Sequence, residues 1–237
     1  MLEYVQNADT KLRRTRSYVW YVVSLLARLN SVLRGTNADV FKTLLYHYRP
    51  APAKVIDVTC GEKHFWDKIK PSLGNTTLDG GKGYVVVYSD IRPIGDFQVD
   101  YRFILDKYPE LEDQFDVVVY DPPYTELTLR VNGVEKWLNN NRYGMDKFKA
   151  EMTLSDSHFQ LFVKQAWRLL KSDGILIVKL QDTANWWHFR FWENMKPLSL
   201  VALHIHDLEQ NWAENVMVKN AKMPIPLHAY WFILEKY

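Results

Sequence analysis

The stretch Asp116-Val-Val-Val-Tyr120, followed at once by Asp121-Pro122-Pro123-Tyr124, decides the fold. Valines suit a pleated surface that is covered on both faces, so residues 116–120 are predicted to form a buried strand. Proline cannot donate to a sheet ladder, and the chain must therefore leave the sheet at Pro122. A carboxylate, a rigid carbonyl and an aromatic ring are thus placed just beyond a strand's C-terminal end, where open α/β sheets bind ligands. A plain proline turn is the alternative that this stretch alone leaves open.

Other apolar runs predict further strands on both sides of this one. They lie at residues 55–58, 84–88, 96–100, 174–180, 199–206 and 229–235. Helices are predicted between them, one beginning after residue 64 and one running from Ser155 to about Leu170. Strands that alternate with helices are typical of an α/β fold, so we expect a mostly parallel sheet of seven strands, flanked by helices, in residues 51–237.

Residues 1–50 are predicted to form a separate basic arm with helices. They hold eight Lys or Arg and three Asp or Glu, a net charge of 8 − 3 = +5, whereas the whole chain carries +2. Periodic apolar residues and a cap at Ser17 predict a helix that runs to about Arg34. Asn37 is predicted to cap a second helix that ends at Tyr48. The first helix also suits a dimer interface or a membrane surface, so a homodimer is an open alternative.

Composition excludes several classes of protein. The only cysteine, Cys60, rules out an internal disulfide framework and a cysteine-based zinc cluster. No signal peptide is recognised, and the most apolar segment, residues 18–33, is too short to span a bilayer. We therefore expect a cytoplasmic protein. His204 and His206 share a face of a predicted strand, where we expect solvated or hydrogen-bonded histidines, with a metal pair as the alternative.

Four acids fall at the C-terminal ends of consecutive predicted strands. They are Asp57, Asp90, Asp100 and Asp121. A parallel sheet brings these ends to one edge, so the four carboxylates are expected to line a single crevice. Because loops favour aspartate in any case, two alternatives stay open at this point, a nucleoside-type cofactor site and ordinary loop acids.

Several segments together resemble class I, Rossmann-like S-adenosylmethionine-dependent methyltransferases of the DNA amino-methyltransferase type, the N-6 adenine and N-4 cytosine methylases. Residues 121–124 match the family's catalytic Asp-Pro-Pro-Tyr motif in full, and residues 55–61 are similar to its cofactor-binding first motif. Ser89-Asp90-Ile-Arg-Pro93 resembles the segment whose acid holds the cofactor ribose. Asp100-Tyr-Arg102 resembles the segment that meets the adenine ring, and residues 170–179 are similar to the helix-turn-strand after the catalytic motif.

The resemblance implies S-adenosylmethionine as the cofactor and assigns roles to particular residues. The implied cofactor-binding residues are Asp57, Thr59, Cys60, Gly61, Asp90, Ile91, Asp100 and Tyr101, and the implied catalytic residues are Asp121, Pro122, Pro123 and Tyr124. One departure concerns the first motif, which in the family has a second glycine two residues after the first. Lys63 takes that place here, and we expect it to change how the loop sits without forbidding the cofactor.

The implied reaction is methyl transfer to the exocyclic amine of a base. The Asp121 carboxylate and the Pro122 carbonyl accept the two amine hydrogens, and Tyr124 stacks on the base. A base in a duplex must be flipped out to reach such a site. Phosphate contacts are expected from basic residues of the arm and of an insertion at residues 125–154. They are Arg13, Arg14, Arg16, Arg130, Lys136, Arg142, Lys147 and Lys149.

We expect DNA as the substrate and restriction-modification as the context. Adenine N6 is favoured over cytosine N4, because the family's cytosine enzymes more often carry serine where this chain has Asp121. Two alternatives stay open. One is an RNA methyltransferase acting on an exocyclic amine such as guanine N2, because such enzymes share this type of motif. The other is a non-catalytic nucleic-acid-binding protein on the same fold, which Lys63 supports and the intact motif opposes.

Overall fold

The structure is a computed structural model that describes residues 29–67, 83–122, 128–131, 134–137, 155–181, 187–207 and 228–237. The chain divides into two compact units, residues 1–31 and 32–237. Only residues 29–31 of the first unit are described, so residues 1–28 of the predicted basic arm lie outside the described residues. No helix in the described part of the chain is long and apolar enough to cross a bilayer.

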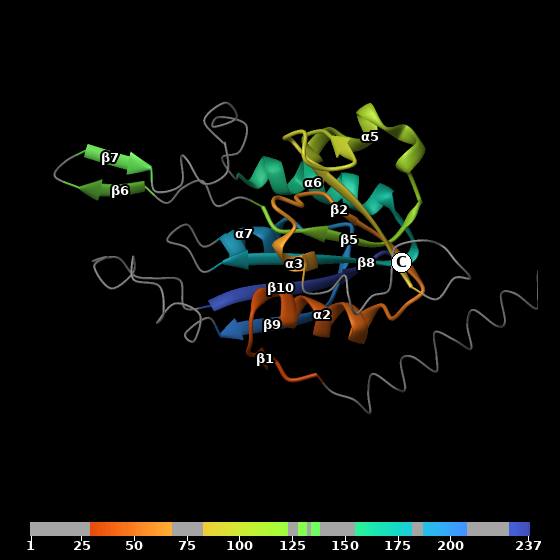
Figure 1. Cartoon of the computed structure of the whole chain (residues 1–237), viewed down its shortest axis with the longest axis horizontal. Helices are drawn as coiled ribbons and strands as arrows, with labels where there is room; N and C mark the ends of the chain where they lie inside the picture. The colour runs from red at the N-terminus through yellow and green to blue at the C-terminus, as the bar shows by residue number, and fades with distance from the viewer. Residues whose placement is uncertain are drawn as a thin grey trace, which may run out of the picture. The chain divides into compact units, whose positions relative to one another are not determined.

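The second unit is built on a sheet of eight strands in its described part. Along the chain these are β1 (Val32–Leu33), β2 (Ala53–Asp57), β3 (Tyr84–Asp90), β4 (Phe97–Gln98), β5 (Phe115–Tyr120), β8 (Leu170–Gln181), β9 (Ser199–Asp207) and β10 (His228–Glu235). Their order across the sheet is β1-β9-β10-β8-β5-β2-β3-β4 (Figure 1). Every neighbouring pair is parallel except those of β10, which runs antiparallel to β8 and β9. The predicted mostly parallel sheet is confirmed, and β1 adds an eighth strand.

Helices cover both faces of this sheet (Figure 1). α2 (Asn37–Tyr48) and α3 (His64–Asp67) lie on one face, where the ring centroids of Phe41 and Trp231 are 6.1 Å apart. α5 (Ile104–Lys107), α6 (Asp156–Leu169) and α7 (Trp187–Glu193) cover the other, where Tyr120 stacks on Phe162 with centroids 3.9 Å apart. The short helices η1 (Tyr101–Phe103) and η2 (Pro109–Leu111) lie between β4 and β5 along the chain. The valines of β5 are buried because both faces are covered.

The predicted first helix does not reach Arg34. Val32 and Leu33 form β1 instead, paired in parallel with Ile205 and His206 of β9. A β-branched valine at a sheet edge favours the strand, and its partners lie too far along the chain for local periodicity to reveal them. Residues 29–36 are therefore not helical, and the prediction is wrong for this segment.

The second predicted helix is confirmed, but its cap is Thr36 and not Asn37. The Thr36 side chain accepts a hydrogen bond from the backbone N–H of Asp39 at 3.2 Å. The Asp39 carboxylate in turn accepts one from the backbone N–H of Thr36 at 3.0 Å. This is a capping box with aspartate in the third position, and it satisfies two donors at the helix start.

Two further differences lie on either side of α6. β8 begins at Leu170 and not at Gly174, because Leu170 already pairs with Phe115, and a register shift follows near Asp173, whose φ is +62°. The insertion predicted at residues 125–154 contains an antiparallel hairpin of β6 (Thr128–Val131) and β7 (Val134–Trp137). Its register pairs Arg130 with Glu135, a feature that the sequence did not lead us to expect.

Candidate active site

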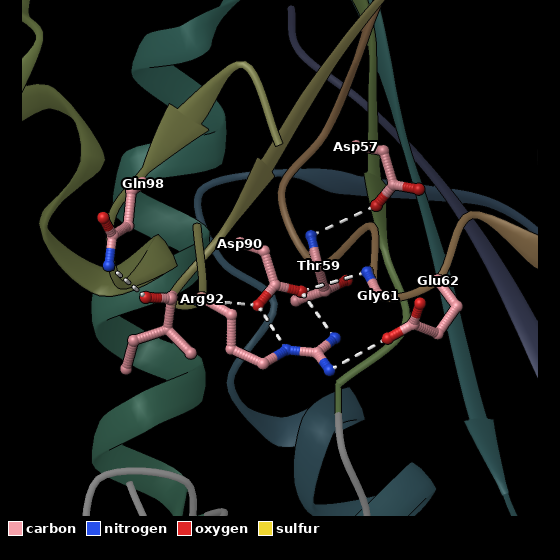
Figure 2. A network of polar contacts seen from close by, with 8 residues as sticks. Asp57, Thr59, Gly61, Glu62, Asp90, Arg92 and Gln98 are labelled. Atoms are coloured by element: carbon pink, nitrogen blue, oxygen red, sulfur yellow. Dashed lines mark hydrogen bonds and ion pairs between the residues drawn. The ribbon is translucent and has the colours of Figure 1, made fainter. Parts of the chain in front are cut away.

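Asp57 ends β2 and holds the loop that follows it. The residue is only 3% exposed, and its Oδ2 accepts a hydrogen bond from Trp66 Nε1 at 2.7 Å. Oδ1 accepts one from the backbone N–H of Thr59 at 3.1 Å (Figure 2). No cation contacts this carboxylate among the residues that the structure describes. Asp57 thus connects the loop to α3, and its contact with a cofactor stays a prediction.

The surroundings of Asp57 raise the pKa of its carboxyl group to about 7. Burial is the largest cause, and the nearby carboxylates of Asp121 and Asp90 add to it, whereas the bonds from Trp66 and Thr59 act in the opposite direction. In an unfolded chain an aspartate titrates at about pH 4. Between these two values the folded protein holds a proton that the unfolded chain releases. The resulting stabilisation is fully present below about pH 4 and is lost as the pH rises through about 7.

We expect the free energy of unfolding of the wild type, relative to that of Asp57→Asn, to fall as the pH rises from about 4 to about 7. The slope should reach at most about 1.4 kcal/mol per pH unit, because asparagine cannot take up this proton. Urea denaturation at a series of pH values measures the difference. The exposed Asp106→Asn serves as the matched control. A wild-type-to-variant difference that stays constant across this range contradicts the assigned environment of Asp57.

The loop that carries Gly61 and Lys63 keeps a glycine-like path. Both residues have positive φ, +49° at Gly61 and +60° at Lys63. For a lysine this left-handed conformation costs about 1 kcal/mol. The Lys63 ammonium lies 4.5 Å from the centroid of the Tyr88 ring, a cation–π contact that offsets part of that cost. Lys63 thus adopts a left-handed conformation that glycine takes more readily.

Asp90 ends β3 beside this loop. Its Oδ2 accepts a hydrogen bond from the backbone N–H of Gly61 at 3.0 Å. Its Oδ1 accepts from the backbone N–H of Arg92 at 2.9 Å and from Arg92 Nε at 3.0 Å. The Arg92 guanidinium reaches on to Glu62 Oε1, with Nη1 at 3.2 Å (Figure 2). The two predicted cofactor segments are therefore joined by direct contacts.

Asp121 follows β5 and is tied to the same loop. Its backbone N–H donates to Thr59 Oγ1 at 2.8 Å. Both carboxylate oxygens lie 3.3 Å from Lys179 Nζ. Lys179 stands on β8, is 3% exposed and lies 5.1 Å from the centroid of the Phe65 ring. Pro122 is buried. Asp121, the first residue of the predicted catalytic motif, is therefore anchored on the loop that holds Thr59 and on a buried lysine.

Asp100 and Tyr101 lie further along the same edge. Asp100 caps η1, and its carboxylate is held by Arg102, whose Nε lies 2.9 Å from Oδ1. The Tyr101 ring is buried in the core, with centroids 5.0 Å from Tyr120 and 5.6 Å from Phe162. Burial raises the pKa of its hydroxyl to about 12. The side chain of Tyr101 thus serves the core, and contact with an adenine ring stays a prediction for this segment.

For two other predicted cofactor residues, Cys60 and Ile91, the observed contacts support the loop backbone. Cys60 is buried, and its backbone N–H donates to the carbonyl of Ser89 at 3.1 Å. Burial raises the pKa of its thiol to about 12, and Asp57 and Asp90 act in the same direction, so the thiol stays protonated at neutral pH. The carbonyl of Ile91 accepts a hydrogen bond from Gln98 Nε2 at 3.2 Å. Both contacts hold the backbone of the loops and leave their ligand contacts as predictions.

Three of the four edge acids have a cation that the sequence analysis missed. The pairs are Asp90 with Arg92, Asp100 with Arg102, and Asp121 with Lys179. A signal for the first two exists in the sequence, because each is an Asp-x-Arg step at the end of a predicted strand. The third has none, because Lys179 joins Asp121 only through the pairing of β5 with β8.

The remaining predicted site residues are described in part or not at all. Arg130 belongs to β6 and Lys136 to β7 of the antiparallel pair. Outside the described residues lie Pro123, Tyr124, Arg13, Arg14, Arg16, Arg142, Lys147 and Lys149. The two histidines of β9 are hydrogen-bonded, His204 to the Tyr48 hydroxyl at 2.6 Å and His206 to the carbonyl of Gly35 at 2.8 Å. No cluster of three or more metal-ligating side chains occurs in the described ranges.

Comparison with known proteins identifies the fold. No family model matches the chain, and no curated protein matches it. Among solved structures, TrmN from Thermus thermophilus is 14% identical with a TM-score of 0.50, over 84% of this chain and 48% of its own. The PH0226 protein from Pyrococcus horikoshii is 12% identical with a TM-score of 0.49, over 84% of this chain and 89% of its own. A TehB-like SAM-dependent methyltransferase from Corynebacterium glutamicum is 16% identical with a TM-score of 0.45, over 95% and 99%.

At these identities the likeness concerns the fold alone. The chain has a Rossmann-like class I methyltransferase fold, as the resemblance implied. It spans about half the length of TrmN.

Proposed function

We propose that this protein is an S-adenosylmethionine-dependent methyltransferase that modifies the exocyclic amine of a flipped-out base, with adenine N6 in DNA as the favoured target. One observation carries the proposal. Asp121 leaves the central strand of a methyltransferase fold at the ligand-binding edge, bonded to Thr59 of the loop that precedes Gly61. The acid of an Asp-Pro-Pro-Tyr motif is thereby set beside the residues proposed to hold the cofactor.

The residues at this edge fit a nucleoside cofactor. Asp90 is a buried acid at the end of β3, suited to accept hydrogen bonds from ribose hydroxyls. Gly61 has positive φ and no side chain, and an added Cβ would meet only ordinary contacts, at 3.8 Å from Arg92 Nη2. Asp57, Thr59 and Cys60 shape this loop. Ile91 follows Asp90 directly, and Asp100 caps η1. When bound, S-adenosylmethionine supplies an electrophilic methyl group on sulfur.

The protein's task is then to prepare a poor nucleophile. The lone pair of an exocyclic amine is delocalised into the base, so the amine must be oriented and its hydrogens accepted. The Asp121 carboxylate and the Pro122 carbonyl form an acceptor-only pair for this purpose. Lys179 holds the carboxylate from its buried side. Most of the acceleration comes from this positioning for in-line attack, which can contribute several powers of ten.

Tyr124 and the basic residues complete the proposed substrate site. Tyr124 stacks on the face of the flipped base. Phosphates are contacted by basic residues on the arm and the insertion. They are Arg13, Arg14, Arg16, Arg130, Lys136, Arg142, Lys147 and Lys149. Because these contacts read no bases, sequence preference has to come from the insertion that carries β6 and β7.

The proposal is tested with S-adenosylmethionine that carries a labelled methyl group, incubated with the protein and separate pools of DNA and RNA. We expect label in DNA, recovered as N6-methyladenine after digestion to nucleosides. Label as N4-methylcytosine corrects the base, and label in RNA guanine supports the RNA alternative. Absence of label from both pools contradicts the proposed activity.

A further inference from the structure

The carboxylate proposed to hold the cofactor ribose is already fully occupied by protein donors. A carboxylate offers about four lone-pair positions. In Asp90, Oδ1 accepts from Arg92 N at 2.9 Å and Arg92 Nε at 3.0 Å, and Oδ2 accepts from Gly61 N at 3.0 Å and Arg92 Nη2 at 3.4 Å. These four bonds use all four positions (Figure 2). A ribose hydroxyl can bind Asp90 only if one of these donors leaves.

The backbone around Asp90 is held from both sides, and two backbone N–H groups, those of Gly61 and Arg92, hold its carboxylate. The carbonyl of Ser89 accepts from Cys60 N at 3.1 Å, and that of Asp90 accepts from Val99 N at 2.9 Å. Gln98 Nε2 holds the next carbonyl, that of Ile91. The Gly61 and Arg92 N–H donors belong to the same fixed loops. The donors that can leave are therefore Nε and Nη2 of the Arg92 side chain.

We propose that Arg92 is a clasp on Asp90, which the vicinal diol of a nucleoside cofactor displaces when it binds. The inference rests on the proposed function, in which Asp90 holds the ribose. The exchange conserves hydrogen bonds, because the two hydroxyls of the diol replace the two guanidinium N–H donors. The two backbone donors stay in place and keep the carboxylate oriented.

Glu62 can keep the displaced guanidinium paired. Its Oε1 already accepts from Arg92 Nη1 at 3.2 Å, and its side chain is 51% exposed, whereas that of Arg92 is 13% exposed. A rotation of the arginine toward solvent can break the two bonds to Asp90 while the ion pair with Glu62 persists. The clasp therefore lowers the affinity for the cofactor by the free energy of breaking the Arg92–Asp90 pair, whose side chains are 13% and 10% exposed, less that of the hydroxyl bonds that replace it.

Titration calorimetry with S-adenosylhomocysteine and with its 2′-deoxy analogue tests the clasp. We expect Arg92→Ala to bind S-adenosylhomocysteine about tenfold more tightly than the wild type, because the binding-competent arrangement no longer has to be populated at the expense of the ion pair. The gain should be smaller for the deoxy analogue, which lacks one of the two hydroxyls that replace the guanidinium. Arg92→Lys keeps the charge but not the planar fork, so its affinity for S-adenosylhomocysteine should lie between those of the wild type and Arg92→Ala.

Arg168→Ala is the matched control for the loss of one positive charge. Arg168 pairs with Glu112 at 2.7 Å, beside η2 and away from the Asp90 loop, and this variant should bind as the wild type does. Thermal unfolding of each variant checks the fold. The clasp is overturned if both Arg92 variants bind S-adenosylhomocysteine as tightly as the wild type or more weakly. It is also overturned if the gain in affinity is the same for the 2′-deoxy analogue, or if no protein in the series binds either ligand. Binding in the expected order without any methyl transfer to nucleic acid contradicts the proposed activity and leaves the clasp standing.

Discussion

Replacing Asp121 by alanine is expected to lower the rate of methyl transfer by at least about 1,000-fold, because positioning of the amine supplies most of the acceleration. The affinity for S-adenosylhomocysteine should change by no more than a few-fold, since Asp121 is proposed to face the amine and not the cofactor. Single-turnover transfer to DNA and calorimetry on the same preparation measure the two quantities. Loss of cofactor binding in a folded variant places Asp121 in the cofactor site and contradicts its proposed role.

Asp121→Ala needs a control because it removes the carboxylate that pairs with the buried ammonium of Lys179. Breaking a buried pair from one side costs about 3–5 kcal/mol, enough to endanger the fold. Removing both members in Asp121→Ala/Lys179→Met avoids the unpaired charge and should restore the free energy of unfolding without restoring activity. Asp121→Asn, which keeps one acceptor oxygen, should retain more activity than either.

The parts of the fold that were predictable are those that local apolar patterns specify. β2, β3 and β5 are short apolar runs rich in valine and isoleucine, of which β5 is the most fully buried. α6 has an apolar stripe with a cap at Ser155. Their order along the chain was sufficient to bring Asp57, Asp90 and Asp121 to one edge. β1 was missed because its two residues become a strand only through β9, which lies far along the chain.

The cations of the site were less predictable than its acids. Aspartates at strand ends stand out in a sequence, but their partners depend on side-chain direction. Arg92 lies two residues from Asp90 and was read as part of a motif, although it occupies the carboxylate proposed to bind ribose. Lys179 was read as the end of a strand, although strand pairing brings it to Asp121. Lys63 was expected to change the loop, and the loop accommodates it at positive φ.

Lys179→Met is expected to lower the rate of methyl transfer by about 10- to 100-fold with little change in the affinity for S-adenosylhomocysteine. One ammonium lies 3.3 Å from each oxygen of Asp121, so rotation of the carboxylate plane lengthens at least one of the two contacts. Lys179 is in this way a positioning residue that acts through Asp121, and a misplacement of about 1 Å at a reacting group can cost 100-fold in rate. Methionine preserves the length of the side chain and suits the neighbouring Phe65 ring.

A graded series separates positioning from a merely structural role. Lys179→Gln keeps a donor but not the charge, so its kcat should lie between those of the wild type and Lys179→Met, while the KM for DNA stays close to that of the wild type. If Lys179 serves the fold alone, both variants lose thermal stability and the folded fraction keeps its kcat. A rate equal to or above that of the wild type in Lys179→Met means that the ammonium competes with the amine for Asp121. Either result contradicts the assignment, because a positioning lysine must change kcat in the fully folded enzyme.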